Sequence, residues 1–268
     1  MRPSRELQRL ISSLAPYWAG EAEVIRAYFE GPKRTVQSDL SWLARQCRKE
    51  FWDSLDGHKE GLFIGPLKVL VDEGTAERID RGFDRHEALD LAEGAFQEFA
   101  HYVAFADAYD AIRSNDDSPI DPYRLRDLES WPENEALSDL RARHRSEHGE
   151  IGARAFRLTE GGYCSLFSEG MRLKGRNARD DAIAKACAAV YDDEFGHMLK
   201  GIAGLEREGL AEPDWRLLES LAIAQMRARL PMRNAQFGHP VAASRIDQLR
   251  AGQAAPVAFD YRRAGFEK

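Results

Sequence analysis

Long segments with helical periodicity fill most of the chain, and this feature limits the possible folds more than any other. Apolar residues recur every three or four positions, whereas the alternation of Val, Ile or Thr with polar residues that predicts a half-buried strand is hard to find. The pattern predicts helices over 36–57, 77–113, 132–172, 177–207 and 213–230. Three consecutive segments are longer than roughly 30 residues, well above the usual helix length of about 11–12. We therefore expect an all-α protein built on a long helical bundle.

The bundle is expected to form one domain over 1–268, with its core at 36–207. One or two short helices over 4–31, interrupted near Pro16, would precede this core. Residues 208–268 would add a helix and, from Pro231 onward, an irregular tail rich in Ala, Gly and Pro. Asn177 is the expected N-cap of the helix at 177–207, since acidic residues follow in its first turn.

Composition excludes several classes of protein. The net charge is −7, so the phosphate backbone of a nucleic acid would be repelled. No apolar run reaches the roughly 18 residues of a membrane span, and the amino terminus lacks a signal-peptide pattern. The three cysteines are too few and too scattered for a disulfide framework or a thiolate metal site. A cytoplasmic protein is expected.

Two segments share the pattern Glu-x-x-His, Glu98–His101 and Glu194–His197. A spacing of three places both side chains on one helix face, where they can reach the same metal ion. Because the chain contains seven histidines, such a pair also arises by chance, and either pair could be a buried polar contact or face solvent. The pattern therefore needs support from its surroundings.

The surroundings place acidic side chains on apolar helix faces. Leu91, Phe105 and Ile112 lie at heptad spacings from Glu98, and Glu160 lies between apolar residues such as Phe156. A buried carboxylate costs several kcal/mol unless it is paired or binds a metal. Glu160 could instead be a surface acid. If it is buried, each of three bundle helices brings an acidic side chain to an apolar face, and carboxylates with imidazoles suit iron.

This arrangement resembles the ferritin-like di-iron carboxylate proteins, in which two bundle helices each supply one Glu or Asp and two supply Glu-x-x-His. Glu160 precedes Glu194 by 34 positions, a spacing similar to that of the family, and Asp193 directly before Glu194 completes an Asp-Glu-x-x-His signature. The resemblance covers about residues 36–207. It implies a ferritin-like four-helix bundle with extra N- and C-terminal helices. It also implies two iron ions held by Glu98, His101, Glu160, Glu194 and His197.

The resemblance implies further roles and leaves one ligand open. Asp193 would accept a hydrogen bond from a ligand imidazole, and Glu160 and Asp193 would take part in catalysis. The family also expects a carboxylate on the helix before Glu98. Glu60, which lies 38 positions upstream, suits two antiparallel helices better than Glu73, which lies 25 upstream, but the choice stays open.

The expected function is a non-haem di-iron oxygenase or oxidase that uses O2 to hydroxylate, desaturate or N-oxygenate a small organic substrate. Phe105 occupies the position of the radical tyrosine of ribonucleotide reductase, so a stable tyrosyl radical is not expected. The substrate pocket would be lined by apolar residues such as Phe105, Phe156, Phe167 and Met198.

A ferredoxin or reductase would supply electrons to this oxygenase. The protein would be a monomer or homodimer, and a manganese–iron pair is an alternative to two irons. Two other functions stay open, a ferroxidase or peroxide-scavenging iron protein and a metal-free helical binding protein.

Overall fold

The computed structural model of the chain describes residues 2–52, 63–126, 131–159 and 163–267. These residues form helices and no β-strand, which confirms the all-α prediction. The longer helices are α1 (Arg5–Phe29), α2 (Val36–Trp52), α5 (Arg85–Ile112), α7 (Pro132–Thr159), α9 (Ala178–Glu208) and α10 (Glu212–Gln236). The shorter ones are α3 (Ile64–Val71), α4 (Glu73–Arg78), α6 (Pro122–Arg126), α8 (Ser165–Met171) and α11 (Ala243–Arg250). Within the described part of the chain, no helix has the length and apolar character of a membrane span.

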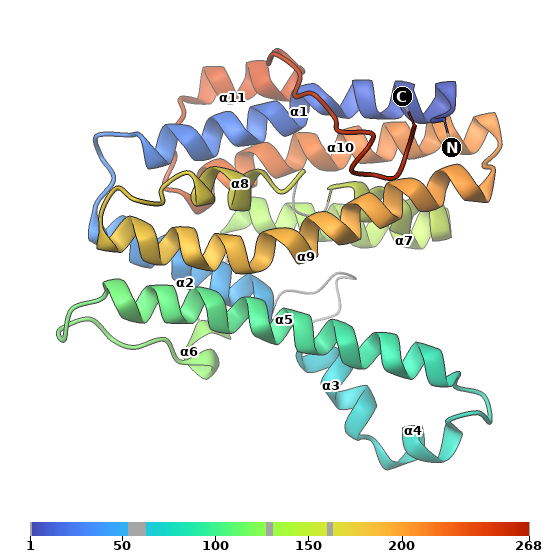
Figure 1. Cartoon of the computed structure of the whole chain (residues 1–268), viewed down its shortest axis with the longest axis horizontal. Coiled ribbons are helices and arrows are strands. Elements are labelled where there is room, and N and C mark those ends of the chain that lie inside the picture. The colour runs from blue at the N-terminus through green and yellow to red at the C-terminus, as the bar shows by residue number, and fades with distance from the viewer. Residues whose placement is uncertain (1, 53–62, 127–130, 160–162, 268) are drawn as a thin grey trace.

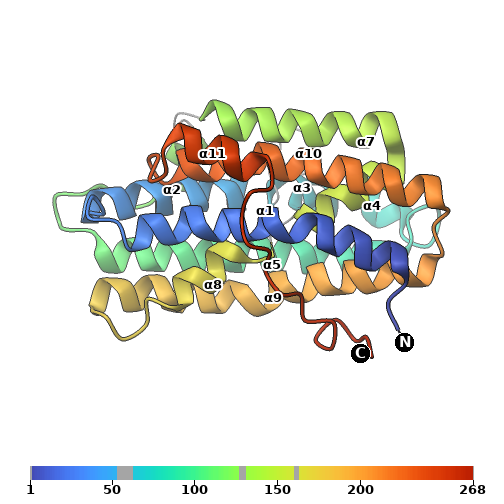
Figure 2. The ribbon, with the colours of Figure 1, turned by 90° about the horizontal axis from the view of Figure 1, so that it is seen from above.

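The long helices lie side by side along the long axis of the molecule (Figures 1 and 2). The α1 and α10 helices pack together, α9 and α7 lie to either side of them, and α2 packs against α5. The N-terminal half of α5, together with α3 and α4, extends away from the other helices (Figure 1).

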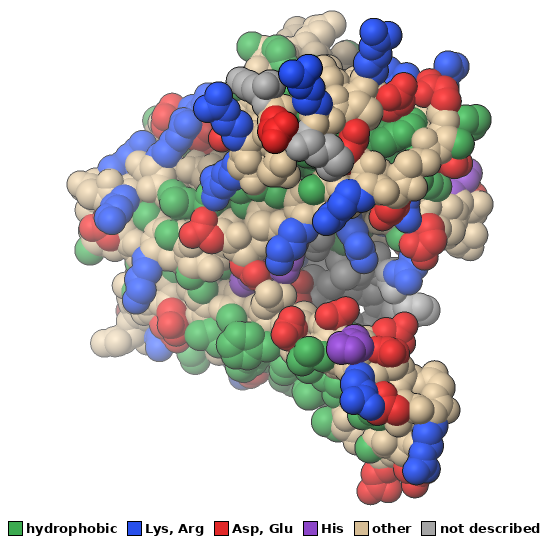
Figure 3. Space-filling view, turned by 45° about the vertical axis from the view of Figure 1, so that its right-hand side comes forward, with side chains coloured by type: hydrophobic (Ala, Val, Ile, Leu, Met, Phe, Trp, Pro, Cys, Tyr) green, Lys and Arg blue, Asp and Glu red, His purple; other side chains and the backbone are tan. Residues whose placement is uncertain are grey.

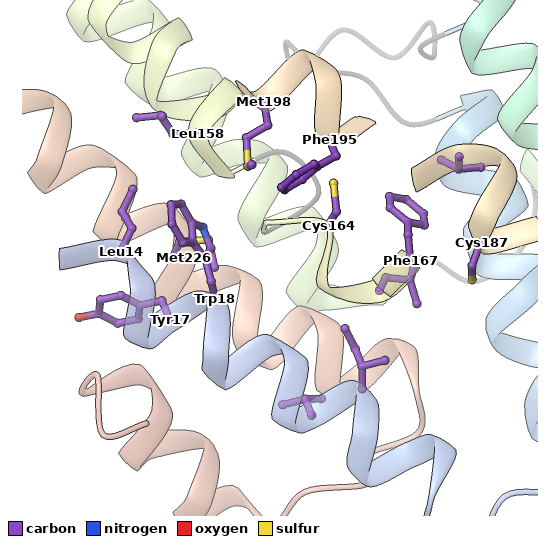
Figure 4. Packing of buried hydrophobic residues seen from close by; sticks show 14 of the residues in the cluster. Leu14, Tyr17, Trp18, Leu158, Cys164, Phe167, Cys187, Phe195, Met198 and Met226 are labelled. Carbon is purple, nitrogen blue, oxygen red and sulfur yellow. The ribbon is translucent and has the colours of Figure 1, made fainter. Parts of the chain in front are cut away.

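The core is continuous across these helices, and α1 and α10 contribute to its centre (Figure 4). Trp18 of α1 is 1% exposed and stacks on the Tyr163 ring at a centroid distance of 4.9 Å. Leu14 of α1 and Met226 of α10 are fully buried in the same cluster. Burying a large apolar side chain stabilises a fold by about 1.5–3 kcal/mol. The helices that the sequence places outside 36–207 are therefore part of the core.

Two predicted interruptions are wrong because α1 continues through Pro16 and α10 through Pro231. A proline inside a helix costs about 3 kcal/mol, since it removes one backbone hydrogen bond. The burial of neighbouring apolar side chains offsets this cost. Leu14 and Trp18, on either side of Pro16, are both buried. The tail is also less irregular than expected, since α11 forms within it.

The segment 77–113 was expected to be one helix, and the structure divides it. The α4 helix ends at Arg78, and a turn with Asp80 at a φ of 61° leads to α5. Asp84 caps α5, because its side chain accepts a hydrogen bond from the His86 backbone N–H at 2.6 Å. Asn177 caps α9 as predicted, through the backbone N–H of Asp180 at 3.0 Å.

The segment 132–172 is likewise not one helix. Gly149 has a φ of 53° and a ψ of −127°, and the chain turns back there, so that a Cβ on Gly152 would lie 2.1 Å from the His144 carbonyl oxygen. Only glycine adopts this backbone conformation at low cost. Tyr163 and Cys164 are left-handed, and α8 begins after them. The helix prediction missed these turns because apolar periodicity continues through them.

Replacing Gly149 with alanine should lower the free energy of unfolding by about 1–3 kcal/mol, because an L residue is strained at this φ and ψ. Gly94→Ala is the matched control, since Gly94 lies inside α5 with open space around it and alanine favours helix there. Urea unfolding monitored by circular dichroism measures both variants. Equal stability of the Gly149 and Gly94 variants would contradict the reversal at Gly149.

Candidate metal centre

Three helices bring polar side chains to one point in the bundle. Glu98 and His101 come from α5, Asp193 and Glu194 from α9, and Glu50 from α2. The α5 and α9 helices run antiparallel, because Gln97 and His101 of α5 both contact Asp193 while residues later in α5 lie beside residues earlier in α9. The antiparallel register thus brings both Glu-x-x-His segments to the same level of the bundle.

His101 is the centre of this group and is 4% exposed. Its Nε2 lies 3.0 Å from Oδ2 of Asp193. Since an ionised carboxylate can only accept, the imidazole donates its Nε2 proton. Asp193 is itself held by Gln97, whose Nε2 donates to Asp193 Oδ1 at 2.9 Å. These contacts fix the ring of His101 and its tautomer.

The other ring nitrogen of His101 faces carboxylate oxygens. Nδ1 lies 3.4 Å from Glu194 Oε1 and 3.9 Å from Glu98 Oε2, and it forms no hydrogen bond with a described residue. A neutral imidazole that donates through Nε2 presents its Nδ1 lone pair to these negative oxygens, which is unfavourable in a buried site. A cation between them, either a proton or a metal ion, removes the repulsion.

Glu50 completes the group, and the sequence analysis did not identify it. Ligand atoms of Glu50, Glu98 and His101 all lie within 4.8 Å of one another, the spacing of groups that share a metal ion. Glu50 is 6% exposed, and the side-chain amide of Gln46 donates a hydrogen bond to its Oε1. Leu43, Gln46, Cys47 and Glu50 share one buried face of α2. An acid on that apolar stripe was the signal that could have revealed it.

Of the two upstream acids proposed from the sequence, only Glu73 lies within the described residues, and it does not contribute to the site. Glu73 is exposed on α4, away from the group on α2, α5 and α9. Glu60 lies outside the described residues, as does Glu160. The remaining acidic candidates, Glu98 and Glu194, both lie beside His101.

His197 takes a different position from the other predicted ligands. Its side chain is 41% exposed, and its Nε2 lies 3.6 Å from Asp193 Oδ1. It lines a hollow of about 630 Å³ between the facing sides of α7 and α9, with Asp90 of α5 across from them; we call this the α7–α9 hollow. Asp193 therefore contacts both predicted ligand histidines, one on the buried side and one on the side of the hollow.

The group is bordered by apolar residues. Phe105 is fully buried, and it packs on Phe167 of α8 at a ring centroid distance of 6.2 Å. These two residues and Met198 form part of the core, and none of them lines the α7–α9 hollow. Burial, with the nearby charge of Glu50, raises the pKa of the Cys47 thiol well above its ordinary value, so Cys47 is a neutral thiol.

A chain of buried polar contacts connects Glu50 to α1 and α10. Gln236 donates to Gln46 at 2.8 Å, and Arg233 donates to Gln236. Arg233 also donates to Glu21 at 2.7 Å. Burial lowers the pKa of Arg233 to about 10, so it stays a cation at neutral pH. Glu50 is thus held at the end of a hydrogen-bonded chain that begins at a buried ion pair.

Comparison of the chain with protein-family models, with curated proteins and with solved structures found no match. The chemistry of the site therefore rests on its own residues.

Replacing Glu50 with glutamine should weaken binding of Mn²⁺ at least about tenfold, because one anionic ligand is lost while the shape of the side chain is kept. Glu73→Gln is the matched control and should leave the affinity unchanged. Titration of the Mn²⁺ electron paramagnetic resonance signal measures both variants. An affinity in Glu50→Gln equal to that of the parent and of Glu73→Gln would contradict the assignment of Glu50.

Proposed function

We propose that this protein is a metal-dependent oxidoreductase of the ferritin-like di-iron type, which uses O2 to hydroxylate, desaturate or N-oxygenate a small organic substrate. The orientation of His101 carries the proposal. Its Nε2 donates to Asp193 while its Nδ1 faces Glu194 and Glu98, as expected of an imidazole that binds a metal through Nδ1. A ferritin-like arrangement of the bundle is part of the same proposal.

The donor set fits iron. Glu50, Glu98 and His101 offer carboxylate oxygens and one imidazole nitrogen within reach of a single ion. Oxygen and imidazole ligands suit iron and manganese, whereas the neutral thiol of Cys47 offers no thiolate. Glu194 lies next to the same imidazole and would serve a second ion together with His197 and Glu160. Bound iron would supply the redox chemistry that activates O2.

The residues of the chain have separate tasks in this proposal. The carboxylates of Glu50, Glu98 and Glu194 would balance the charge of the metal ions. Asp193 keeps the proton on Nε2 of His101 and thereby leaves Nδ1 free to bind metal. The buried rings of Phe105 and Tyr102 lie on the same helix and restrict the access of water.

The α7–α9 hollow favours an organic substrate over iron oxidation alone. Its volume of about 630 Å³ is within the range of about 300–1,000 Å³ for small-molecule sites. It reaches His197, whose side chain also approaches Asp193. A hydroxylation consumes more electrons than its substrate provides, so a ferredoxin or reductase would act as electron donor.

Anaerobic loading with Fe²⁺ followed by air should give about two irons per chain and an O2-dependent near-ultraviolet absorption band. His101→Ala should lose most of the band, because both the ligand and its link to Asp193 are removed. His86→Ala is the matched control, since His86 is exposed at the start of α5. Metal analysis and absorption spectroscopy measure the outcome.

Two results would overturn the proposal in different ways. No bound iron or manganese in the parent protein would leave a metal-free helical protein. Iron oxidation in a hollow multi-subunit shell, with no product from any added organic substrate, would favour a ferroxidase. Size-exclusion chromatography with light scattering determines the assembly.

A further inference from the structure

The α7–α9 hollow has a floor without side chains. Gly201 and Gly204 lie on the face of α9 that lines it. A Cβ on Gly201 would lie 4.0 Å from Arg157 Cβ, and one on Gly204 would lie 3.9 Å from Glu208 Oε1, both ordinary contacts. Alanine would therefore fit at both positions and would favour the helix by about 1 kcal/mol each. Close helix packing does not require these glycines, and their effect is to widen the hollow.

The walls of the hollow carry charges of both signs, and only some of these charges are paired within the described residues. Arg154 is paired with Glu208. Arg157 and Lys200, and likewise Asp90 and Glu150, form no ion pair with another described residue. Figure 3 shows basic, acidic and histidine side chains gathered around the space between the protruding part of α5 and the rest of the bundle.

These charges are arranged along the hollow. Arg157 lies opposite Gly201, and Lys200 is three residues after His197, so both cations are at the end near the metal group. Glu150 is seven residues before Arg157 on the same helical segment, which corresponds to about 10 Å along the axis. The cations Arg157 and Lys200 thus lie beside His197, and the acidic Glu150 lies at the end of the hollow away from it.

We propose that the α7–α9 hollow binds the substrate, and that this substrate is a small extended zwitterion. Its carboxylate would lie between Arg157 and Lys200, and its ammonium group would lie toward Glu150. The apolar body would cross the floor formed by Gly201 and Gly204. This assignment of the reaction site rests on the proposed function, whereas the binding of such a molecule to the hollow does not require metal.

Three probes with the same six-carbon body test the charge arrangement: 6-aminohexanoate, hexanoate and hexylamine. Binding to the metal-free full chain is measured by ligand-observed nuclear magnetic resonance titration. The zwitterion should bind most tightly. Arg157→Gln and Lys200→Gln should each lower the affinity for 6-aminohexanoate and hexanoate by about fivefold or more. Neither variant should change the affinity for hexylamine. Glu150→Gln should instead lower the affinity for 6-aminohexanoate and hexylamine.

Filling the floor tests the location. Gly204→Leu should abolish binding of 6-aminohexanoate without loss of thermal stability, because leucine favours helix and projects into open space. Two exposed positions supply the controls: Ala188→Leu, on the same helix, and Arg176→Gln, a cation elsewhere. Both variants should bind 6-aminohexanoate as the parent does.

Equal binding of the three probes, no binding of any of them, or unchanged binding in Gly204→Leu would overturn the inference. Iron binding in the parent protein is measured separately. If iron binds and the probes fail, only the substrate site is wrong, and if the probes bind and iron does not, only the proposed function is wrong.

Discussion

The arrangement of the helices depends on how the negative charges of the buried acidic side chains are compensated. Burying an ionised carboxylate among apolar helices costs several kcal/mol unless cations or hydrogen bonds offset the cost. Glu21 is balanced by Arg229 and Arg233 across α1 and α10. Glu50 accepts from Gln46, and Glu98 and Glu194 lie next to a single imidazole. Nδ1 of His101 faces the Glu98 and Glu194 carboxylates, and the proposed metal ion would bind at this point.

The same balance fixes the register of α5 against α9. Asp193 contacts His101 and Gln97, which lie one helical turn apart on α5. A shift of either helix by one turn would separate these groups and leave the buried ring of His101 without its hydrogen bond to Asp193. The register also positions the α7–α9 hollow, since His197 follows Asp193 by one turn and lies at the edge of the hollow. The contact between α5 and α9 therefore positions both the residues around His101 and the proposed substrate site.

Much of the helical structure could be predicted from apolar spacing, and part of the site could be predicted from the two Glu-x-x-His segments. The structure gathers Glu98, His101, Asp193 and Glu194, although their roles as ligands stay a prediction. The reversal at Gly149 could not be predicted, because it depends on one residue within a continuous apolar pattern. Glu50 was missed because spacing from the family favoured acids closer to Glu98, whereas burial on the face of α2 is what identifies it.

The location of the metal is the central claim, and a crystal structure of the iron-loaded protein tests it most directly. Diffraction data collected on both sides of the iron absorption edge should show an anomalous peak between Glu50, Glu98 and Nδ1 of His101. The Nε2 of His101 should remain hydrogen-bonded to Asp193. An iron peak elsewhere in the molecule, or no ordered iron in crystals of a protein that is loaded with Fe²⁺, would contradict the account.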